Sequence, residues 1–221
     1  RVRHCGMPGR VRNIGVAAAG GEWIAFLDSD DLWLPGKLLR QQQYLAVRED
    51  TTLLHTREVW LRMDREVSQR KLRHRRSGDI FADALRKCII GPSTVILRRS
   101  RFVELGGFRE DMEIAEDYEL WLRWCALEPV DYLDEPLVIK RAGSWDQLSV
   151  KYGQIEKFRI DGLHHLVAGN WFAEHAGLER QRMAERELLR KGRIYAAGAR
   201  KRGRLTEALQ YEEMTRQQAD S

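Results

Sequence analysis

Two aspartates follow directly after a short apolar run, and this feature most constrains the fold. Residues 23–27 read Trp-Ile-Ala-Phe-Leu, and Asp28, Ser29 and Asp30 come next. A run of five apolar residues bounded by polar ones favours a buried strand of a parallel sheet over a helix, because the run is short and uniformly apolar. Ligands of open α/β sheets bind beyond the carboxyl ends of such strands. The chain is therefore expected to be an α/β protein with a ligand site at these aspartates.

The spacing of the aspartates suggests a metal. On an extended chain Asp28 and Asp30 would face the same way while Ser29 faces away. Mg²⁺ and Mn²⁺ prefer oxygen ligands, and Mg²⁺ is usually held by one or two carboxylates plus substrate phosphates. The pair therefore predicts a divalent cation that holds a diphosphate. The same residues also suit an ordinary polar turn that caps a helix expected over residues 35–47.

The residues around this motif are distinctive. They comprise Arg12, Asn13, Ile14 and Gly15, then residues 21–35, then Lys37, Leu38 and Gln41. Together they resemble the core block of family 2 glycosyltransferases of the GT-A fold. The resemblance implies a mixed, Rossmann-like sheet flanked by helices, with Mg²⁺ or Mn²⁺ at Asp28 and Asp30. It also implies donor contacts from Arg12, Asn13, Asp28, Ser29 and Asp30, and substrate contacts from Asp31 and Trp33.

A second group of motifs extends the resemblance. It comprises residues 91–94 (Gly-Pro-Ser-Thr), 105–108 (Leu-Gly-Gly-Phe) and 116–123 (Glu-Asp-Tyr-Glu-Leu-Trp-Leu-Arg). In such families the Glu-Asp pair opens a helix and its aspartate is the usual catalytic base. The resemblance thus implies Asp117 as base, Glu116 beside it, and Pro92, Ser93 and Thr94 near the acceptor.

Local patterning agrees with a helix that begins near Asp117. Leu120, Trp121, Trp124 and Leu127 recur at helical spacing. A carboxylate in the first turn is stabilised by the helix dipole, which favours the ionised form that a general base needs. The alternative is that the two acids only cap the helix.

These motifs imply one reaction. A sugar would pass from a nucleoside diphosphate sugar, expected to be a UDP-sugar, to a hydroxyl of a saccharide or glycolipid acceptor, with inversion. Asp117 would take the hydroxyl proton and the metal would neutralise the departing diphosphate. Such transfer would serve cell-surface polysaccharide or glycoconjugate synthesis. No defensible Ser-His-Asp or Cys-His pattern competes with this reaction.

Composition limits the other classes of function. With 43% hydrophobic and 32% charged residues the chain of 221 residues is expected to be globular, and no apolar stretch is long enough for a transmembrane helix. Cys5, Cys88 and Cys125 are scattered, which predicts a reduced cytoplasmic setting. Peripheral contact at the inner face of the membrane is a separate expectation. A net charge of +5 would also suit a nucleic-acid-binding protein. However, the arginines are spread along the chain and no nucleic-acid-binding motif is present, so no nucleic-acid partner is expected.

The chain is expected to divide into a partial GT-A domain over residues 1–152 and an all-helical extension over 153–221. The first strands of the domain are expected to be absent, which would leave an exposed sheet edge and a half-built nucleotide pocket. Further helices are expected over 10–20 and 78–87, and strands over 52–63, 94–97, 130–133 and 137–140. Residues 191–202 and 205–216 resemble one tetratricopeptide-like hairpin. The alternative to an enzyme is an inactive fragment that acts as a helical interaction module.

Two further segments each have more than one interpretation. Residues 143–149 resemble a late loop of the family and imply substrate contacts from Trp145, Asp146 and Gln147. Some family members carry a histidine where Ser144 stands, and its absence here puts a third metal ligand in doubt. Trp145 could also be a core residue. The basic run over residues 65–76 suits a solvated loop, or a cationic rim for an acidic acceptor or an anionic membrane.

Overall fold

The computed structural model describes residues 6–62, 65–67, 76–142 and 154–217. Six strands form one mixed sheet in the order β1 (Trp23–Ala25), β5 (Ile96–Arg98), β3 (Leu53–Arg62), β6 (Asp131–Ala142) and β2 (Asp31–Trp33), with β4 (Arg65–Val67) paired to β3. β3 and β6 are parallel, and the other pairs are antiparallel. The predicted mixed sheet is confirmed.

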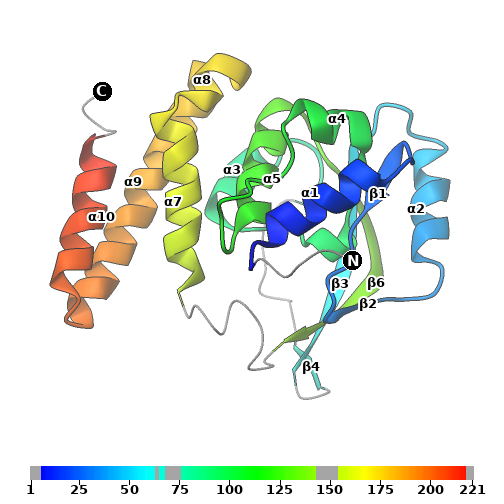
Figure 1. Cartoon of the computed structure of the whole chain (residues 1–221), viewed down its shortest axis with the longest axis horizontal. Coiled ribbons are helices and arrows are strands. Elements are labelled where there is room, and N and C mark those ends of the chain that lie inside the picture. Colours follow the sequence, from blue (N-terminus) through cyan, green and yellow to red (C-terminus); the bar gives the residue numbers. More distant parts are fainter. Residues whose placement is uncertain (1–5, 63–64, 68–75, 143–153, 218–221) are drawn as a thin grey trace.

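Helices cover the sheet on both sides (Figure 1). One side carries α2 (Lys37–Leu45), and the other carries α1 (Pro8–Ala18), α3 (Phe81–Arg86), α4 (Arg99–Glu104) and α5 (Glu116–Leu127). A short 3₁₀ helix, η1 (Pro92–Thr94), precedes β5. Proline opens α1 where no intrahelical donor is needed, and three acids favour the first turn of α5.

The predicted helical extension is also confirmed. It contains α7 (Ile155–Ala168), α8 (Trp171–Ala176), α9 (Leu178–Lys201) and α10 (Leu205–Gln217). The last two form a hairpin, as predicted, although α9 is longer than the predicted helix. They approach closely, because a Cβ on Gly192 would lie 2.2 Å from Thr215 Cγ2. No described helix is long and apolar enough to span a membrane.

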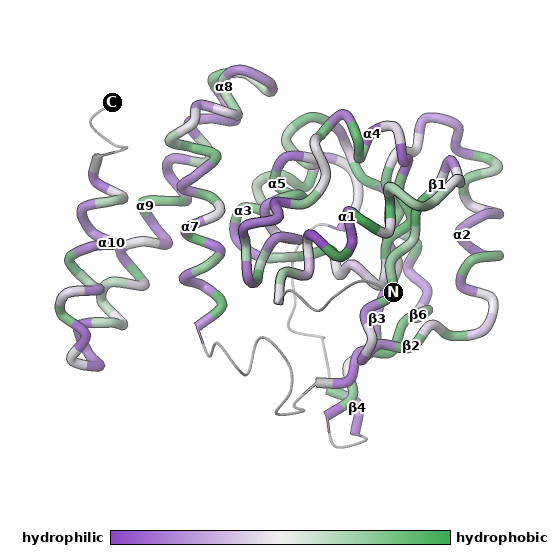
Figure 2. Tube along the Cα trace, in the orientation of Figure 1, coloured by the Kyte–Doolittle hydropathy of each residue, from purple (hydrophilic) through white to green (hydrophobic). Residues whose placement is uncertain are grey.

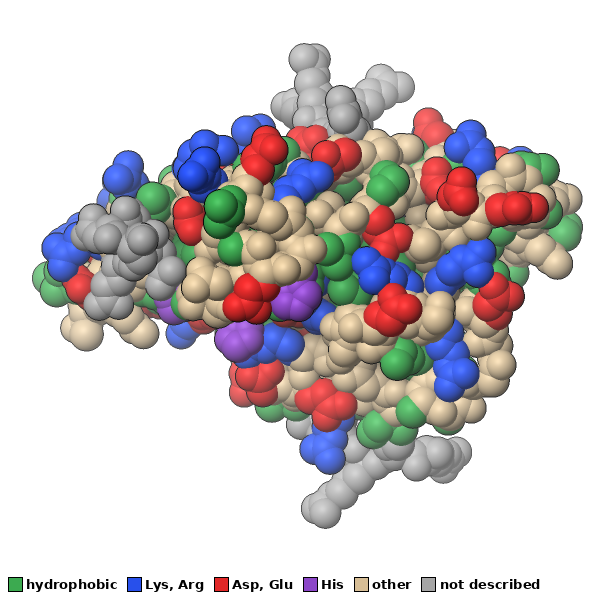
Figure 3. All heavy atoms as spheres, turned by 90° about the horizontal axis from the view of Figure 1, so that it is seen from above, with side chains coloured by type: hydrophobic (Ala, Val, Ile, Leu, Met, Phe, Trp, Pro, Cys, Tyr) green, Lys and Arg blue, Asp and Glu red, His purple; other side chains and the backbone are tan. Residues whose placement is uncertain are grey.

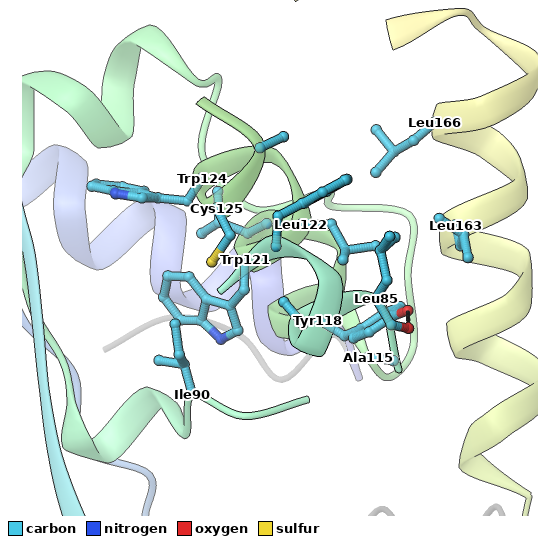
Figure 4. Close-up of a cluster of buried hydrophobic side chains, with 14 of the residues drawn as sticks. Leu85, Ile90, Ala115, Tyr118, Trp121, Leu122, Trp124, Cys125, Leu163 and Leu166 are labelled. Carbon is cyan, nitrogen blue, oxygen red and sulfur yellow. Dashed lines mark hydrogen bonds between the residues drawn. The ribbon is translucent and has the colours of Figure 1, made fainter. Parts of the chain in front are cut away.

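One hydrophobic core joins the sheet region to the helical extension. Tyr118, Trp121 and Trp124 of α5 are at most 2% exposed and belong to the same cluster as Leu163 and Leu166 of α7. Figure 4 shows these two leucines facing the α5 cluster. In Figure 2 hydrophobic residues gather in the central strands, whereas α9 and α10 alternate between hydrophobic and hydrophilic residues. Each large side chain buried here contributes roughly 1.5–3 kcal/mol, so the helices are part of the domain's core.

Several strand predictions were wrong in detail. The run over residues 23–27 is not a strand of a parallel sheet: only Trp23–Ala25 pair, antiparallel to β5, and among the described strands β1 lies at the sheet edge. The two strands expected at 130–133 and 137–140 are one strand, β6, whose pairing with β3 is irregular near Pro136. β2, β4 and α4 were not predicted, and β4 is a strand paired with β3 where the start of a solvated loop was expected. The helix expected from residue 35 begins at Lys37, because Gly36 adopts a left-handed φ of 84°.

Candidate active site

The aspartate motif lies in a turn. The Asp31 N–H donates to the Asp28 carbonyl (3.1 Å), which places Ser29 and Asp30 at the centre of the turn. The predicted alternation of side chains along an extended chain is therefore wrong. Asp28 is partly buried, Asp30 is exposed, and Asp31 is 7% exposed in β2. The three carboxylates remain neighbours, since Asp28 and Asp30 both raise the pKa of Asp31.

The short helix η1 forms hydrogen bonds to this turn and to β2, which follows it. The Asp28 N–H donates to Ser93 Oγ (3.0 Å), and Trp33 Nε1–H donates to the Ser93 carbonyl (2.8 Å). Pro92, Ser93 and Thr94 are all buried. These residues, expected to contact the acceptor, are thus buried, and Ser93 is the one that bonds to the aspartate turn.

Arg12 of α1 joins the turn to α5. Its Nη2 donates to Asp28 Oδ1 (2.6 Å), and its Nη1 donates to Glu116 Oε1. The Arg12 side chain is 16% exposed and that of Glu116 is 5% exposed. Charge-assisted bonds of this kind are stronger than neutral ones. Residues far apart in the sequence are thereby held at one site, and the group that joins them is a guanidinium.

The two acids that open α5 have different surroundings. Glu116 is 4% exposed, and burial raises its pKa to about 7; Asp117 adds to this rise and Arg12 opposes it. Asp117 is half-buried, its Oδ1 accepts the Tyr118 N–H (2.7 Å), and its Oδ2 lies 3.6 Å from Cys88 Sγ. Glu116 is thus ion-paired with Arg12, while the hydrogen-bond donors to Asp117 among the described residues are neutral groups.

Ala115, directly before these acids, has a left-handed φ of 67° and is 2% exposed. A non-glycine residue in this region is uncommon and costs of order 1–3 kcal/mol. Such strain concentrates at functional sites, and here it sets the direction in which α5 leaves the preceding loop.

Asn13 has a structural part in this site. Its Nδ2 donates to the Phe108 carbonyl (2.8 Å), and its Oδ1 accepts the Phe108 N–H (3.0 Å). Gly107 lies against it with a φ of 68°, and a Cβ there would be 2.8 Å from Asn13 Oδ1. The amide therefore locks α1 to the loop before α5, which leaves a donor contact from Asn13 as a prediction.

Lys140, Glu58 and Cys88 complete the site and were not predicted. Lys140 Nζ lies 3.9 Å from Asp31 Oδ2 and 4.0 Å from Glu58 Oε2. Burial raises the pKa of Asp31 to about 6, with Lys140 opposing the shift. Lys140 comes into reach because β6 pairs with β2 and aligns it with Asp31. That pairing joins distant segments and has no local signal.

The residues at the turn fit a cation that the substrate helps to hold. Asp28 and Asp30 offer carboxylate oxygens, and the buried Asp31 Oδ2 has no hydrogen-bond partner in the described part of the chain. That part contains no group of three or more His, Cys, Asp or Glu side chains arranged to hold a metal ion. A hard cation here would take its remaining ligands from a diphosphate and water, as Mg²⁺ commonly does. Ser144, Trp145, Asp146 and Gln147 lie outside the described residues, as does most of the basic run at 65–76.

Comparison with known proteins extends these observations. An uncharacterized glycosyltransferase of Rickettsia bellii is 31% identical over 117 residues, 52% of this chain and 16% of the relative. The amylovoran biosynthesis glycosyltransferase AmsE of Erwinia amylovora is 28% identical over 138 residues, 62% of this chain and 51% of the relative. The Escherichia coli enzyme WfgD, a UDP-Glc:α-D-GlcNAc-diphosphoundecaprenol β-1,3-glucosyltransferase, is 31% identical over 114 residues, 50% of this chain and 41% of that enzyme. The chain therefore spans about half or less of these relatives.

A solved structure and a family model agree with this result. The crystal structure of S. aureus TarS 1-349 superposes with a TM-score of 0.53 at 14% identity, covering 96% of this chain and 72% of that one, which shows a shared fold. The model of the family described as "Glycosyltransferase like family 2" matches residues 4–137, more than half of the chain. The chain therefore belongs to the family 2-like glycosyltransferases.

Proposed function

We propose that this protein transfers a sugar from a UDP-sugar to a hydroxyl of a saccharide or glycolipid, with inversion at the anomeric carbon. The observation that carries the proposal is the Arg12 bridge, because it holds Asp28 and Glu116 within one ion-paired group. A carboxylate turn suited to a diphosphate thus lies beside a helix that begins with acids. This arrangement supports direct displacement without a covalent enzyme intermediate.

Asp117 is assigned the role of general base. It would accept the proton of the acceptor hydroxyl as that oxygen attacks the anomeric carbon. Two features support this choice over Glu116: Asp117 is more exposed, and no described cation forms an ion pair with it within 4.0 Å. Glu116, paired with Arg12, would position the start of α5.

Mg²⁺ or Mn²⁺ is proposed as the cofactor. Asp28 and Asp30 would hold it, and when bound it would neutralise charge on the departing diphosphate. Arg12 would orient Asp28. Lys140 would balance the negative charge of the Asp31 carboxylate, which lies next to the turn.

The relatives support a role in polysaccharide or glycoconjugate synthesis, since AmsE is named for amylovoran biosynthesis and WfgD for a lipid-linked acceptor. The proposed setting is cytoplasmic, with contact at the inner face of the membrane where a glycolipid acceptor would be reached. Cys88 and Cys125 are free thiols, as such a setting allows. Figure 3 shows Lys and Arg interspersed with Asp and Glu on one face, which does not suit a continuous nucleic-acid surface.

The base is tested in the complete protein by assaying sugar transfer and nucleoside diphosphate release with a panel of UDP-sugars. Asp117→Asn should lower kcat by about 10² to 10⁴ with donor KM little changed, the usual contribution of a general base. Glu116→Gln should cost less. Glu113→Gln, at an exposed position before α5, is the matched control and should have no effect. Near-normal turnover by Asp117→Asn would show that another group takes the proton.

The metal is tested separately from the base. Calorimetry of UDP binding with and without Mn²⁺ should show a metal-dependent affinity that Asp30→Ala abolishes. Asp50→Ala removes an exposed carboxylate away from the turn and should retain it. Undiminished Mn²⁺-dependent binding of UDP by Asp30→Ala would rule out this metal site. The same titration with GDP tests the nucleotide: tighter binding of GDP than of UDP would contradict the proposal that the donor is a UDP-sugar.

A further inference from the structure

A large cavity lies where the helical extension meets the sheet region. Its volume is about 940 Å³, and residues of α3, α7 and α9 line it. Its cationic side chains are Arg86, Lys87, Arg159, Arg190, Lys191 and Arg202, and Glu156 is its one acidic side chain. Ile155, Ile160, Ile194 and Tyr195 supply apolar lining. We call this the junction pocket. Its six cations against one carboxylate suit an anion with an attached apolar group.

Part of this charge is balanced within the pocket. Glu156 accepts from Arg159 (2.5 Å) and from Lys191 Nζ (3.2 Å). Burial opposes ionisation of Glu156, but Lys191 and Arg159 outweigh it and lower the pKa of the carboxyl. Arg190 pairs with Glu187 outside the pocket lining (2.6 Å). The internal pairs therefore use one carboxylate for two cations.

Other donors in the pocket have no protein partner within the described residues. Arg86 and Lys87 are exposed, and their side chains form no hydrogen bond or ion pair within the described part of the chain. Arg159 Nε is a buried donor that also has no hydrogen-bond partner there. A buried donor without a partner costs about 1–3 kcal/mol. An oxyanion in the pocket would remove that cost, and Arg and Lys are the usual phosphate-binding residues.

One residue, Cys88, connects the pocket lining with the proposed base. Cys88 lines the pocket, and Cys88 Sγ lies 3.6 Å from Asp117 Oδ2. Arg159 also interacts electrostatically with Asp117. The Asp117 carboxylate therefore lies directly behind one residue of the pocket lining.

We infer that the junction pocket binds the phosphate or diphosphate group of the acceptor and thereby presents the acceptor's hydroxyl to Asp117. This inference rests on the proposed function, because it names the acceptor class for the same site. The donor diphosphate is proposed at Asp28 and Asp30, which do not line the junction pocket, so the two phosphate sites are separate. The apolar lining provides room for a group attached to the phosphate.

The first test uses pyrophosphate as the probe, in EDTA and without donor, so that the metal site does not contribute. Calorimetry at low salt should detect binding that Arg86→Gln/Lys87→Gln weakens at least tenfold. Arg193→Gln/Lys201→Gln removes two exposed charges of α9 that do not line the pocket and is the matched control. Equal binding by the pocket variant and the control, or no binding by the native protein, would overturn the inference. Arg159→Met tests the buried donor in the same way.

The second test distinguishes sources of the phosphate. Farnesyl diphosphate and glucose 1-phosphate are each tested for competition with pyrophosphate. Stronger competition by farnesyl diphosphate supports a lipid-linked acceptor, and stronger competition by glucose 1-phosphate supports a soluble sugar phosphate. Failure of both to compete would contradict an acceptor role. In the complete enzyme, Arg86→Gln/Lys87→Gln should raise acceptor KM while donor KM stays unchanged. Because the binding test needs no turnover, a wrong choice of base would leave its result valid.

Discussion

Arg12 is expected to be the charge on which the site's architecture depends, and Arg12→Met tests this. The variant keeps an unbranched apolar stem but leaves the Glu116 carboxylate buried without its cation. Breaking a buried ion pair by removing one partner costs about 3–5 kcal/mol. The Asp28 side chain is 28% exposed and its pair with Arg12 is partly screened, so we take the lower end, about 3 kcal/mol at pH 8.

The loss should depend on pH with a defined sign. Burial raises the pKa of Glu116 to about 7 in the folded protein, and Arg12 opposes that rise, so removing Arg12 raises the pKa of Glu116 further. Above pH 7 the native protein has an ionised Glu116 paired with Arg12, and the variant does not. Near pH 5 Glu116 is protonated in both folded proteins, so the loss should shrink to about 1–2 kcal/mol.

Urea denaturation at pH 5 and pH 8 measures both values. Arg10→Met on the same helix is the control, because Arg10 is 58% exposed and its nearest carboxylate, of Glu110, is 4.0 Å away. It should change stability little at either pH. Adding Glu116→Gln to Arg12→Met should recover stability at pH 8. An equal loss at both pH values, or no recovery in the double variant, would refute the assignment of a buried ion pair.

Two further predictions concern the scaffold. Burial lowers the pKa of Lys37 to about 7, so the folded protein binds fewer protons than the unfolded chain between about pH 7 and 10.5, and stability should rise with pH there. Lys37→Met should remove about 2 kcal/mol of that rise between pH 7 and 9 in paired urea titrations; parallel curves would contradict the buried lysine. Gly107→Ala should lower stability by about 1 kcal/mol more than Gly106→Ala. Both glycines have positive φ, but only at Gly107 would a Cβ meet other side chains. Equal melting temperatures of the two variants would show that Asn13 and Phe102 move aside.

The sequence predicted elements whose signals are local. α5 begins at Glu116, one residue before its expected start, because first-turn acids and helically spaced apolar residues act within one segment. β3 matches its expected range closely for the same kind of reason. The aspartate motif was found, but its geometry was not: a turn between two short strands, held by Ser93, replaces the expected extended chain.

The missed features depend on contacts between distant segments. β2 has three residues, too few for a recognisable pattern, and forms because it pairs with β6. Lys140 joins the site through that pairing. Cys88 looked like one of three scattered cysteines, and only the packing of α3 beside α5 brings its sulfur to Asp117. The junction pocket likewise requires α9 to pack against α3, which helical periodicity alone does not reveal.

The core that α5 shares with α7 has an evolutionary consequence. Tyr118 and Leu122 on one side and Leu163 and Leu166 on the other must fit each other, since interiors are close-packed. Recombination that exchanged the helical extension between relatives would bring mismatched side chains against the helix that carries Asp117. Successful exchanges should therefore be those that carry α5 along with the extension. Acceptor preference and base placement would then be inherited as one unit, and Asp28 would have to stay compatible with them through its shared partner Arg12.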